Sequence, residues 1–173
     1  MNPRVRAMTP ADCDRVAEIR IRGWQTAYRD LIPASYLDAL SVTRDAERRR
    51  ALLARGDTGG VNLVAEDDGG VTGWACHGPY RDGEVRTRDA ELYALYVDPG
   101  RVGEGIGRAL LDEAVRGCAA AGHARVYLWV LKGNRRARRF YERAGFEADG
   151  AEEPFEADGV AVPEVRYVRE LAG

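Results

Sequence analysis

A glycine-rich turn near the middle of the chain contains the residues with the clearest chemistry. The segment Pro99–Leu111 reads PGRVGEGIGRALL, and a predicted strand before it leads through the glycines into a predicted helix. The first N–H groups of a helix lack intrahelical partners, and the helix dipole adds partial positive charge there. Glycines let a phosphate group approach this backbone closely. The turn therefore predicts a phosphate-binding site; the alternative is a tight strand-to-helix turn that holds no ligand.

Two common phosphate-binding signatures do not fit these glycines. A P-loop requires G-x4-G-K-[ST], and although Gly100 and Gly105 have this spacing, isoleucine and glycine follow them. The dinucleotide signature G-x-G-x-x-G also fails, because its third glycine would fall on Arg108 or Leu110. The missing Lys-[Ser/Thr] pair argues against a nucleotide-binding regulatory domain.

A second segment, NRRARRFYERAGF at 134–146, has the pattern of an arginine-rich amphipathic helix. Asn134 stands at the N-cap position, and Gly145 follows the last helical residue. Arginines near a helix N-terminus oppose the helix dipole, and each costs roughly a few tenths of a kcal/mol when exposed. An anionic ligand nearby would offset this cost; the alternative is a solvated arginine face. The apolar face of this helix consists of Ala137, Phe140, Tyr141 and Ala144.

Together, the two segments resemble the acyl-CoA-binding motif of the GCN5-related N-acetyltransferases. The run Val97-Asp98-Pro99, followed by GEGIGRALL at 103–111, resembles the cofactor turn of that family. The family usually has Gln or Arg where this chain has Val102. Because backbone N–H groups hold the pyrophosphate, we expect cofactor binding despite this departure. The second segment matches the family's downstream helix as Asn134-x-x-Ala137-x-x-Phe140-Tyr141-Glu142-x-x-Gly145-Phe146.

The resemblance implies that the cofactor is acetyl-CoA. It also implies that the strand at 95–97 pairs with the pantetheine arm, and that an N–H group near Val97 stabilises the oxyanion. The cofactor-binding residues implied in this way are Leu95, Val97, Gly103, Gly105, Ile106, Gly107, Arg108, Asn134 and Arg138.

Acyl transfer from a thioester to an amine requires one group that takes the amine proton and another that protonates the departing thiolate. Tyr141 occupies the position that the family uses for the second role. A tyrosine has an ordinary pKa of about 10, so it is protonated at neutral pH and can supply this proton as thiolate charge develops. The resemblance implies Glu91 as the base, because in much of the family a glutamate at this place takes the amine proton, often through water. The alternatives are a packed tyrosine and an ordinary strand-edge carboxylate.

The acceptor site is predicted from aromatic residues. Trp24 and Tyr28 fall in an irregular segment expected after the first helix, where this family often builds its acceptor wall. Tyr93 is two residues from Glu91, so both face the same side of a strand. Each aromatic residue has a core role as its alternative. The segment 147–164 contains seven acidic residues and no basic one, which predicts either attraction of a cationic amine or a solvated loop.

Length and composition predict one globular domain, residues 1–173. The chain is 45% hydrophobic and 31% charged, with a net charge of −2, which is ordinary for a soluble protein. No apolar run reaches the ~18 residues of a membrane span, and residues 1–10 lack a signal-peptide pattern. We therefore expect a cytoplasmic monomer or homodimer without nucleic-acid or membrane partners. Three separated cysteines and two histidines predict no metal site.

Hydrophobic periodicity places strands and helices around these motifs. The expected strands are 4–8, 61–66, 71–77, 91–97, 124–131, 146–148 and 165–171. The expected helices are 11–22, 34–40, 43–55, 104–121 and 134–144, with a charged loop at 81–89 and a turn-rich connection after residue 148. Short connections favour antiparallel pairing, whereas the strand–helix–strand unit at 91–131 needs a parallel crossover. The fold class is therefore α/β: a mixed, mostly antiparallel sheet with one βαβ unit and helices on both faces.

The resulting prediction is an N-acetyltransferase, an enzyme that transfers an acetyl group from acetyl-CoA to a primary amine of a small molecule or peptide. A non-catalytic sensor of coenzyme A or acyl-CoA with the same fold is the main alternative. The presence of both Tyr141 and Glu91 favours the enzyme.

Overall fold

The computed structural model describes residues 3–56, 60–82 and 85–171, without the side chains of 81–87. Within these residues, seven strands form one sheet, and five α-helices pack around it. The strands are β1 (Arg4–Ala7), β2 (Val61–Asp67), β3 (Gly70–Asp82), β4 (Val85–Val97), β5 (Arg125–Leu131), β6 (Glu147–Ala157) and β7 (Val160–Glu170). The helices are α1 (Cys13–Ala27), α2 (Ala34–Asp38), α3 (Val42–Arg55), α4 (Ile106–Ala120) and α5 (Arg135–Arg143). None of the helices described is long and apolar enough to cross a membrane.

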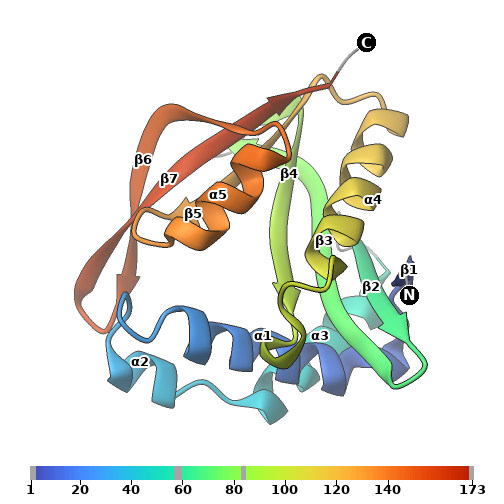
Figure 1. Cartoon of the computed structure of the whole chain (residues 1–173), viewed down its shortest axis with the longest axis vertical. Coiled ribbons are helices and arrows are strands. Elements are labelled where there is room, and N and C mark those ends of the chain that lie inside the picture. The colour runs from blue at the N-terminus through green and yellow to red at the C-terminus, as the bar shows by residue number, and fades with distance from the viewer. Residues whose placement is uncertain (1–2, 57–59, 83–84, 172–173) are drawn as a thin grey trace.

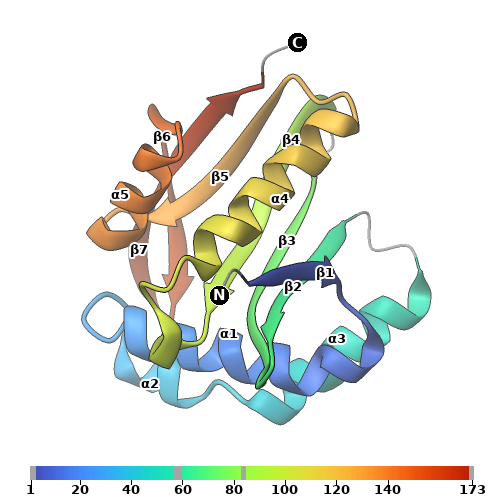
Figure 2. The same cartoon turned by 45° about the vertical axis from the view of Figure 1, so that its right-hand side comes forward.

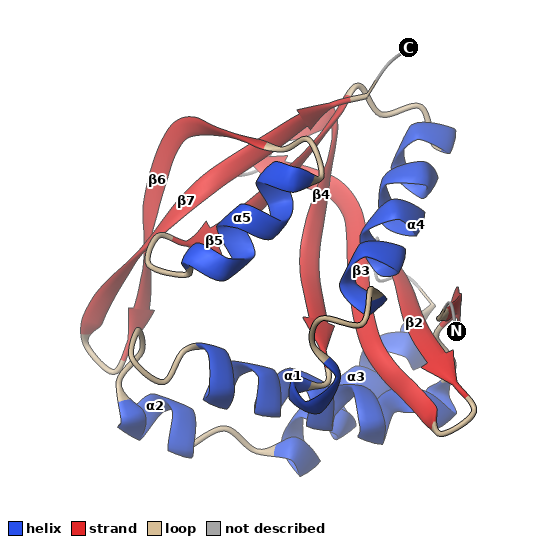
Figure 3. Ribbon diagram, in the orientation of Figure 1, coloured by secondary structure: helices blue, strands red, loops and turns tan. Residues whose placement is uncertain are grey.

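The sheet has the strand order β1-β2-β3-β4-β5-β7-β6 (Figures 1 and 3). Strands β4 and β5 are parallel and are connected through α4, whereas every other neighbouring pair in the described sheet is antiparallel. This arrangement confirms the predicted mixed, mostly antiparallel sheet and its βαβ unit.

Helices cover both faces of the sheet, as predicted. On β2, Leu63 and Ala65 pack into the hydrophobic core that includes Leu110 and Leu111 of α4. Val64, between them, packs with α1 on the other side. Because side chains alternate along a strand, these contacts place α1 and α4 on opposite faces. Figure 2 shows α4 running along the sheet, with α1 and α3 across its lower end.

Strands β4 and β5 remain paired at only two positions, Ala90 with Val126 and Glu91 with Tyr127. Beyond these pairs the two strands diverge (Figures 1 and 2). On this side of β4, residues 92–97 therefore have no strand neighbour within the part of the chain that the structure describes. Unpaired strand edges expose backbone N–H and C=O groups that can bind another extended chain.

A bulge in β4 lies where the strands separate. Cys76 of β3 is opposite Ala94, whereas the next residue, His77, is opposite Leu92, so β4 contains one extra residue, Tyr93. A bulge of this kind redirects the side chains that follow it. After it, Leu95 and Val97 pack toward the α4 core, and Ala94 and Tyr96 pack toward α1.

The prediction of a charged loop at 81–89 is wrong. Strand β3 continues to Asp82, and β4 begins at Val85, with Asp82 opposite Val85 and Arg81 opposite Arg86. Charged side chains do not prevent the backbone ladder of a hairpin from extending, because the ladder uses only main-chain groups. Residues 83–84 of that expected loop lie outside the described residues.

The prediction of a turn-rich connection after residue 148 is also wrong, because this segment forms the long β6–β7 hairpin. Its tip is the two-residue turn Asp158-Gly159, and both residues have positive φ, 48° and 80°. This is the backbone that a two-residue hairpin requires, and Asp-Gly is a common sequence for it. Because β6 is an edge strand, it tolerates Pro154 and many acidic residues.

The first helix is longer than its pattern predicts. It continues through Ala27, so Trp24 lies on α1 rather than in an irregular segment, and Tyr28 follows the last helical residue. Gly23 lies where α1 passes close to the sheet. A Cβ atom at Gly23 would approach Cδ1 of Tyr96 to 3.3 Å, so the glycine lets α1 pack closely on β4.

Candidate active site

A cleft of about 800 Å³ opens where β4 and β5 diverge. Residues of α1, β4, the glycine-rich turn, β5, α5, β6 and β7 line it. The sequence-predicted site residues that line it are Trp24, Tyr28, Glu91, Tyr93, Leu95, Val97, Gly103, Gly105, Ile106, Gly107, Arg108, Asn134 and Tyr141. The fold therefore gathers thirteen of the fourteen candidates, drawn from both halves of the chain, around one opening.

The N-terminus of α4 forms one end of this cleft. Gly105 is its N-cap, with a φ of 84°, and no side chain accepts a hydrogen bond from the first turn. Gly107 is closely packed, because a Cβ atom there would approach Cζ of Phe140 to 3.3 Å. The free N–H groups and the helix dipole make this end suitable for an anion. The basic residues that line the cleft are Arg101, Arg108, Arg136 and Arg143.

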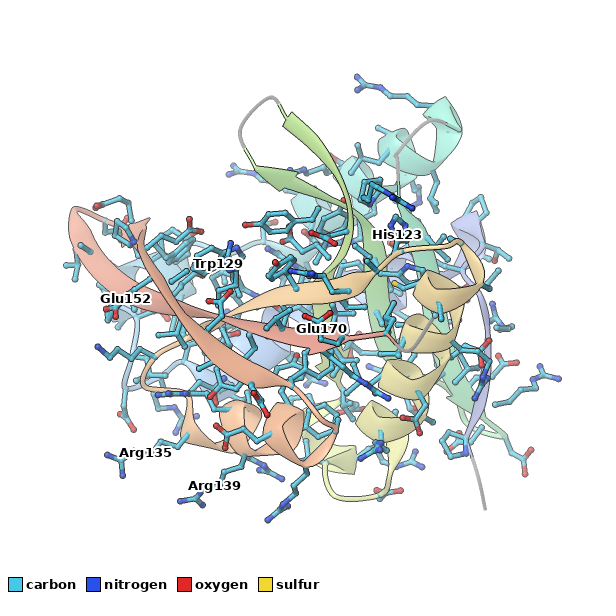
Figure 4. All side chains as sticks on the ribbon, turned by 90° about the horizontal axis from the view of Figure 1, so that it is seen from above. His123, Trp129, Arg135, Arg139, Glu152 and Glu170 are labelled. Carbon is cyan, nitrogen blue, oxygen red and sulfur yellow. The ribbon has the colours of Figure 1, made fainter. Side chains whose placement is uncertain are left out.

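Arg138, predicted to bind the cofactor, is directed elsewhere. Its Nε donates a hydrogen bond to Oη of Tyr167 at 2.9 Å, and its Nη1 donates to the carbonyl of Lys132 at 2.7 Å. It is not among the described residues that line the cleft, whereas Arg136 is. Figure 4 shows Arg135 and Arg139 projecting from α5 away from the body of the protein, as their helical positions predict.

Asn134 caps α5 as expected. Its Oδ1 accepts a hydrogen bond from the backbone N–H of Ala137 at 3.3 Å, and the residue lines the cleft. This cap fixes where α5 begins, at the end of β5. It thereby places Tyr141, two turns further along, beside the open edge of β4.

Tyr141 is almost fully buried, with 9% of its surface exposed, and its ring contacts Phe140 and Phe146 edge-on. Its hydroxyl has no hydrogen-bond partner among the described residues, and the residue lines the cleft. Burial, and then the nearby Tyr96, raise its pKa above the ordinary tyrosine value. The side chain is therefore a protonated hydroxyl that can donate to a group in the cleft.

Tyr96 connects β4 to α1 through a hydrogen bond. Nε1 of Trp24 donates to its hydroxyl at 2.7 Å, and the ring of Tyr28 contacts Trp24 edge-on. Burial raises the pKa of Tyr96, and burial followed by the contact with Tyr96 raises that of Tyr28. This network fixes the two predicted acceptor residues against the cleft. Tyr93 differs, because its hydroxyl donates to the backbone carbonyl of Pro79.

Two cleft residues complete this region and were not predicted individually. Phe155 of β6 packs edge-on against Trp24, with ring centroids 5.6 Å apart. Glu164 of β7 lies opposite Leu131 of β5 and lines the cleft. Glu164 belongs to the acidic segment noted in the sequence, but nothing local distinguishes it from the other six acidic residues there. Only the pairing of β7 with β5 shows which acidic residue reaches the cleft.

Residues 22–146 match the sequence model of the acetyltransferase (GNAT) family. The chain belongs to this family. It is 31% identical over 161 residues to the uncharacterized N-acetyltransferase YuaI of Bacillus subtilis, covering 93% of this chain and 89% of that protein. The family match and this N-acetyltransferase relative identify the protein as an acyl-CoA-dependent acyltransferase.

Solved structures of other N-acetyltransferases share the fold of this GNAT chain. The ribosomal-protein-alanine N-acetyltransferase of Brucella melitensis has a TM-score of 0.78 at 25% identity, covering 97% of this chain and 99% of that one. The putative acetyltransferase yncA of Salmonella typhimurium, solved with acetyl-CoA, has a TM-score of 0.78 at 24% identity, covering 100% and 96%.

The departure of this GNAT sequence at Val102 has a structural counterpart. Val102 is exposed, and Arg101 beside it is held by Asp67 at 2.5 Å and by Glu104 at 2.9 Å. Arg101 lines the cleft but is engaged by carboxylates rather than directed freely at it.

Proposed function

We propose that the protein transfers an acetyl group from acetyl-CoA to a primary amine of a small molecule or peptide. One observation carries this proposal. The same cleft has an uncapped helix N-terminus at one end, an open strand edge along one side and the hydroxyl of the largely buried Tyr141 in its lining. These three features match the three parts of an acyl-CoA: an anionic pyrophosphate, an extended amide arm and a thioester.

The residues present fit acetyl-CoA. The N–H groups of 105–107 would hold the pyrophosphate, where a side chain at Gly105 would stand in the way. The open edge at 92–97 would pair with the amides of the pantetheine arm as a strand does. Exposed Arg136 and Arg143 lie along the same wall and supply positive charge for phosphate.

Acetyl-CoA supplies a thioester carbonyl that an amine can attack, with a thiolate as leaving group. The chain's own groups then have distinct tasks. A backbone N–H near Val97 would stabilise the developing oxyanion. Tyr141 would donate its proton to the thiolate sulfur, and its raised pKa keeps that proton in place at neutral pH. Glu91, at the point where β4 and β5 separate, would collect the amine proton directly or through water.

Ligand-induced stabilisation tests the cofactor. At 100 times its dissociation constant, acetyl-CoA should raise the free energy of unfolding by about 2.7 kcal/mol. ATP at the same concentration should raise it much less, because it has no pantetheine arm to pair with β4. Equal stabilisation by ATP would contradict the assignment. Release of free thiol with any member of a primary-amine library then separates an enzyme from a non-catalytic sensor, which would bind acetyl-CoA and release none.

A further inference from the structure

The charges that line the cleft are separated into two ends. All the basic residues in the described lining come from the glycine-rich turn, α4 and α5: Arg101, Arg108, Arg136 and Arg143. The lining residues of α1 and of β4 to β7 include no basic residue in the described chain, but they include two acidic ones, Glu91 and Glu164. If the first end holds the phosphates of acetyl-CoA, the second end is where the acceptor must lie.

Glu164 has the surroundings of a ligand-binding carboxylate. Its carboxylate forms no hydrogen bond or ion pair with any other described residue, although the residue is half-buried. Burial, followed by the charge of Glu153, raises its pKa. Leaving a partly desolvated carboxylate without a partner is unfavourable, and a cation in the cleft would remove this cost.

Glu164 is also close to the proposed reacting centre. The pKa of Tyr28 is raised mainly by burial, and further by Tyr96, Tyr141 and Glu164. Tyr28, Tyr141 and Glu164 line the same cleft. An amine that contacts Glu164 therefore lies in the cleft that contains the proposed acid.

The walls beside Glu164 are aromatic. Trp24 contacts Tyr28 and Phe155 edge-on, with ring centroids 5.1 and 5.6 Å apart, and Tyr36 packs behind them at 5.7 Å from Phe155. Arg20 stacks on Trp24 at 5.1 Å, but it is paired with Asp45 and does not line the described cleft. The wall is thus an apolar surface that contains one carboxylate and no cation.

We propose that Glu164 binds the ammonium group of the acceptor as it enters the cleft, before the nitrogen loses a proton to Glu91, directly or through water, and attacks the thioester. The acceptor is then a cationic amine with an aromatic or branched apolar body and no carboxylate. This inference rests on the proposed function. The apolar body packs on Trp24, Tyr28 and Phe155, and the ammonium forms a charge-assisted hydrogen bond with Glu164. A carboxylate on the acceptor would meet Glu164 and no compensating basic residue at this end, so the site rejects it.

Matched amines test the substrate class. Phenethylamine and phenylalanine differ only by a carboxylate, so kcat/KM for phenethylamine should be at least tenfold higher, measured by thiol release. Ethylamine has the ammonium without the apolar body and should have a much higher KM. Equal or greater activity with phenylalanine would overturn the proposed class of acceptor.

Variants test the residue. Glu164→Gln keeps the shape but removes the charge, so the affinity of phenethylamine for the protein saturated with coenzyme A should fall about tenfold or more by calorimetry. In turnover, KM for the amine should rise while kcat and the KM for acetyl-CoA stay near their original values. Glu156→Gln is the matched control, because Glu156 is exposed on the same hairpin and is not part of the described cleft lining. Glu91→Gln should behave in the opposite way and lower kcat.

The outcomes separate the two proposals. Unchanged affinity in Glu164→Gln, or a loss of kcat at constant KM, would overturn the assignment of Glu164 as the ammonium-binding residue. If no amine at all causes thiol release, the proposed function fails, and the calorimetric comparison of Glu164→Gln with the parent protein still decides whether the amine binds there.

Discussion

Tyr141 shows how a single side chain acquires its proposed role from its surroundings. The local sequence determines its position on α5. Its burial against Phe140 and Phe146 comes from the packing of α5 on the sheet. Desolvation disfavours the phenolate, and the pKa therefore rises. The hydroxyl thus remains protonated across the neutral range, and no loss of rate from its ionisation is expected until the pH exceeds about 10.

Removing that hydroxyl should isolate its contribution. Tyr141→Phe retains the ring and its packing, so the fold and the affinity for acetyl-CoA should be maintained. Loss of the proton donor should lower kcat by roughly 10²- to 10⁴-fold. Steady-state kinetics with a saturating acceptor measures this change. Tyr127→Phe, which alters a phenol outside the cleft, should have kcat close to that of the parent. Unchanged turnover in Tyr141→Phe would assign the residue to packing alone.

Arg138 shows that helical spacing alone does not predict which arginine lines the cleft. The pattern of the helix places both Arg136 and Arg138 beside the apolar face, and it does not say which one meets another element first. Tyr167 of β7 lies within reach of Arg138 and accepts its Nε–H, so Arg136 is the arginine left at the cleft. A residue from β7, nearly thirty positions away, thus decides the question.

At the scale of an element, the prediction that acetyl-CoA binds can be tested at the N-terminus of α4. Gly105→Glu places a carboxylate at this N-terminus and forces a side chain into a left-handed backbone, which costs about 1–2 kcal/mol by itself. Stabilisation by acetyl-CoA, measured as a shift in Tm, should be abolished.

Gly56→Glu is a matched control for that variant. Gly56 ends α3 with a φ of 66°, and like Gly105 it has no atom within 4 Å of an added Cβ. It lies outside the described cleft lining, so this variant should lose similar stability yet keep the acetyl-CoA shift. Retention of the shift in Gly105→Glu would place the pyrophosphate elsewhere.

The β6–β7 hairpin shows what elements require beyond local composition. Acidic residues and prolines in 147–164 suggest a loop, yet the Asp158-Gly159 turn and pairing with β5 make both segments strands. Edge position explains why the composition is tolerated in β6. The same pairing delivers Phe155 and Glu164 to the cleft, which is why the acceptor side was predicted less completely than the cofactor side.

At the scale of the whole molecule, the central feature is the separation of β4 from β5 after two paired positions. Binding of an extended arm along 92–97 should complete the hydrogen bonding of this edge. Amide hydrogen exchange followed by mass spectrometry should therefore slow at 92–97 and at 105–108 when acetyl-CoA is added. Exchange at 147–157, on the far edge of the sheet, should change little. Unchanged exchange at 92–97 would exclude strand-like binding of the arm.

The sequence by itself determined the elements that local chemistry controls. Glycines at 103–107 predicted the turn, Asn134 and Gly145 delimited α5, and alternation in 91–97 predicted the strand, because caps, turns and periodicity depend on neighbours a few residues apart. Those features sufficed for the fold class, the family and thirteen of the residues that line the cleft. Only the tertiary structure decided where β4 and β5 part and that Tyr96 accepts a hydrogen bond from Trp24. It also decided that Arg136 rather than Arg138 lines the cleft, and that Glu164 is its second carboxylate. These outcomes depend on which distant strands pair and where the pairing stops, and such contacts are set by the packing of the whole chain.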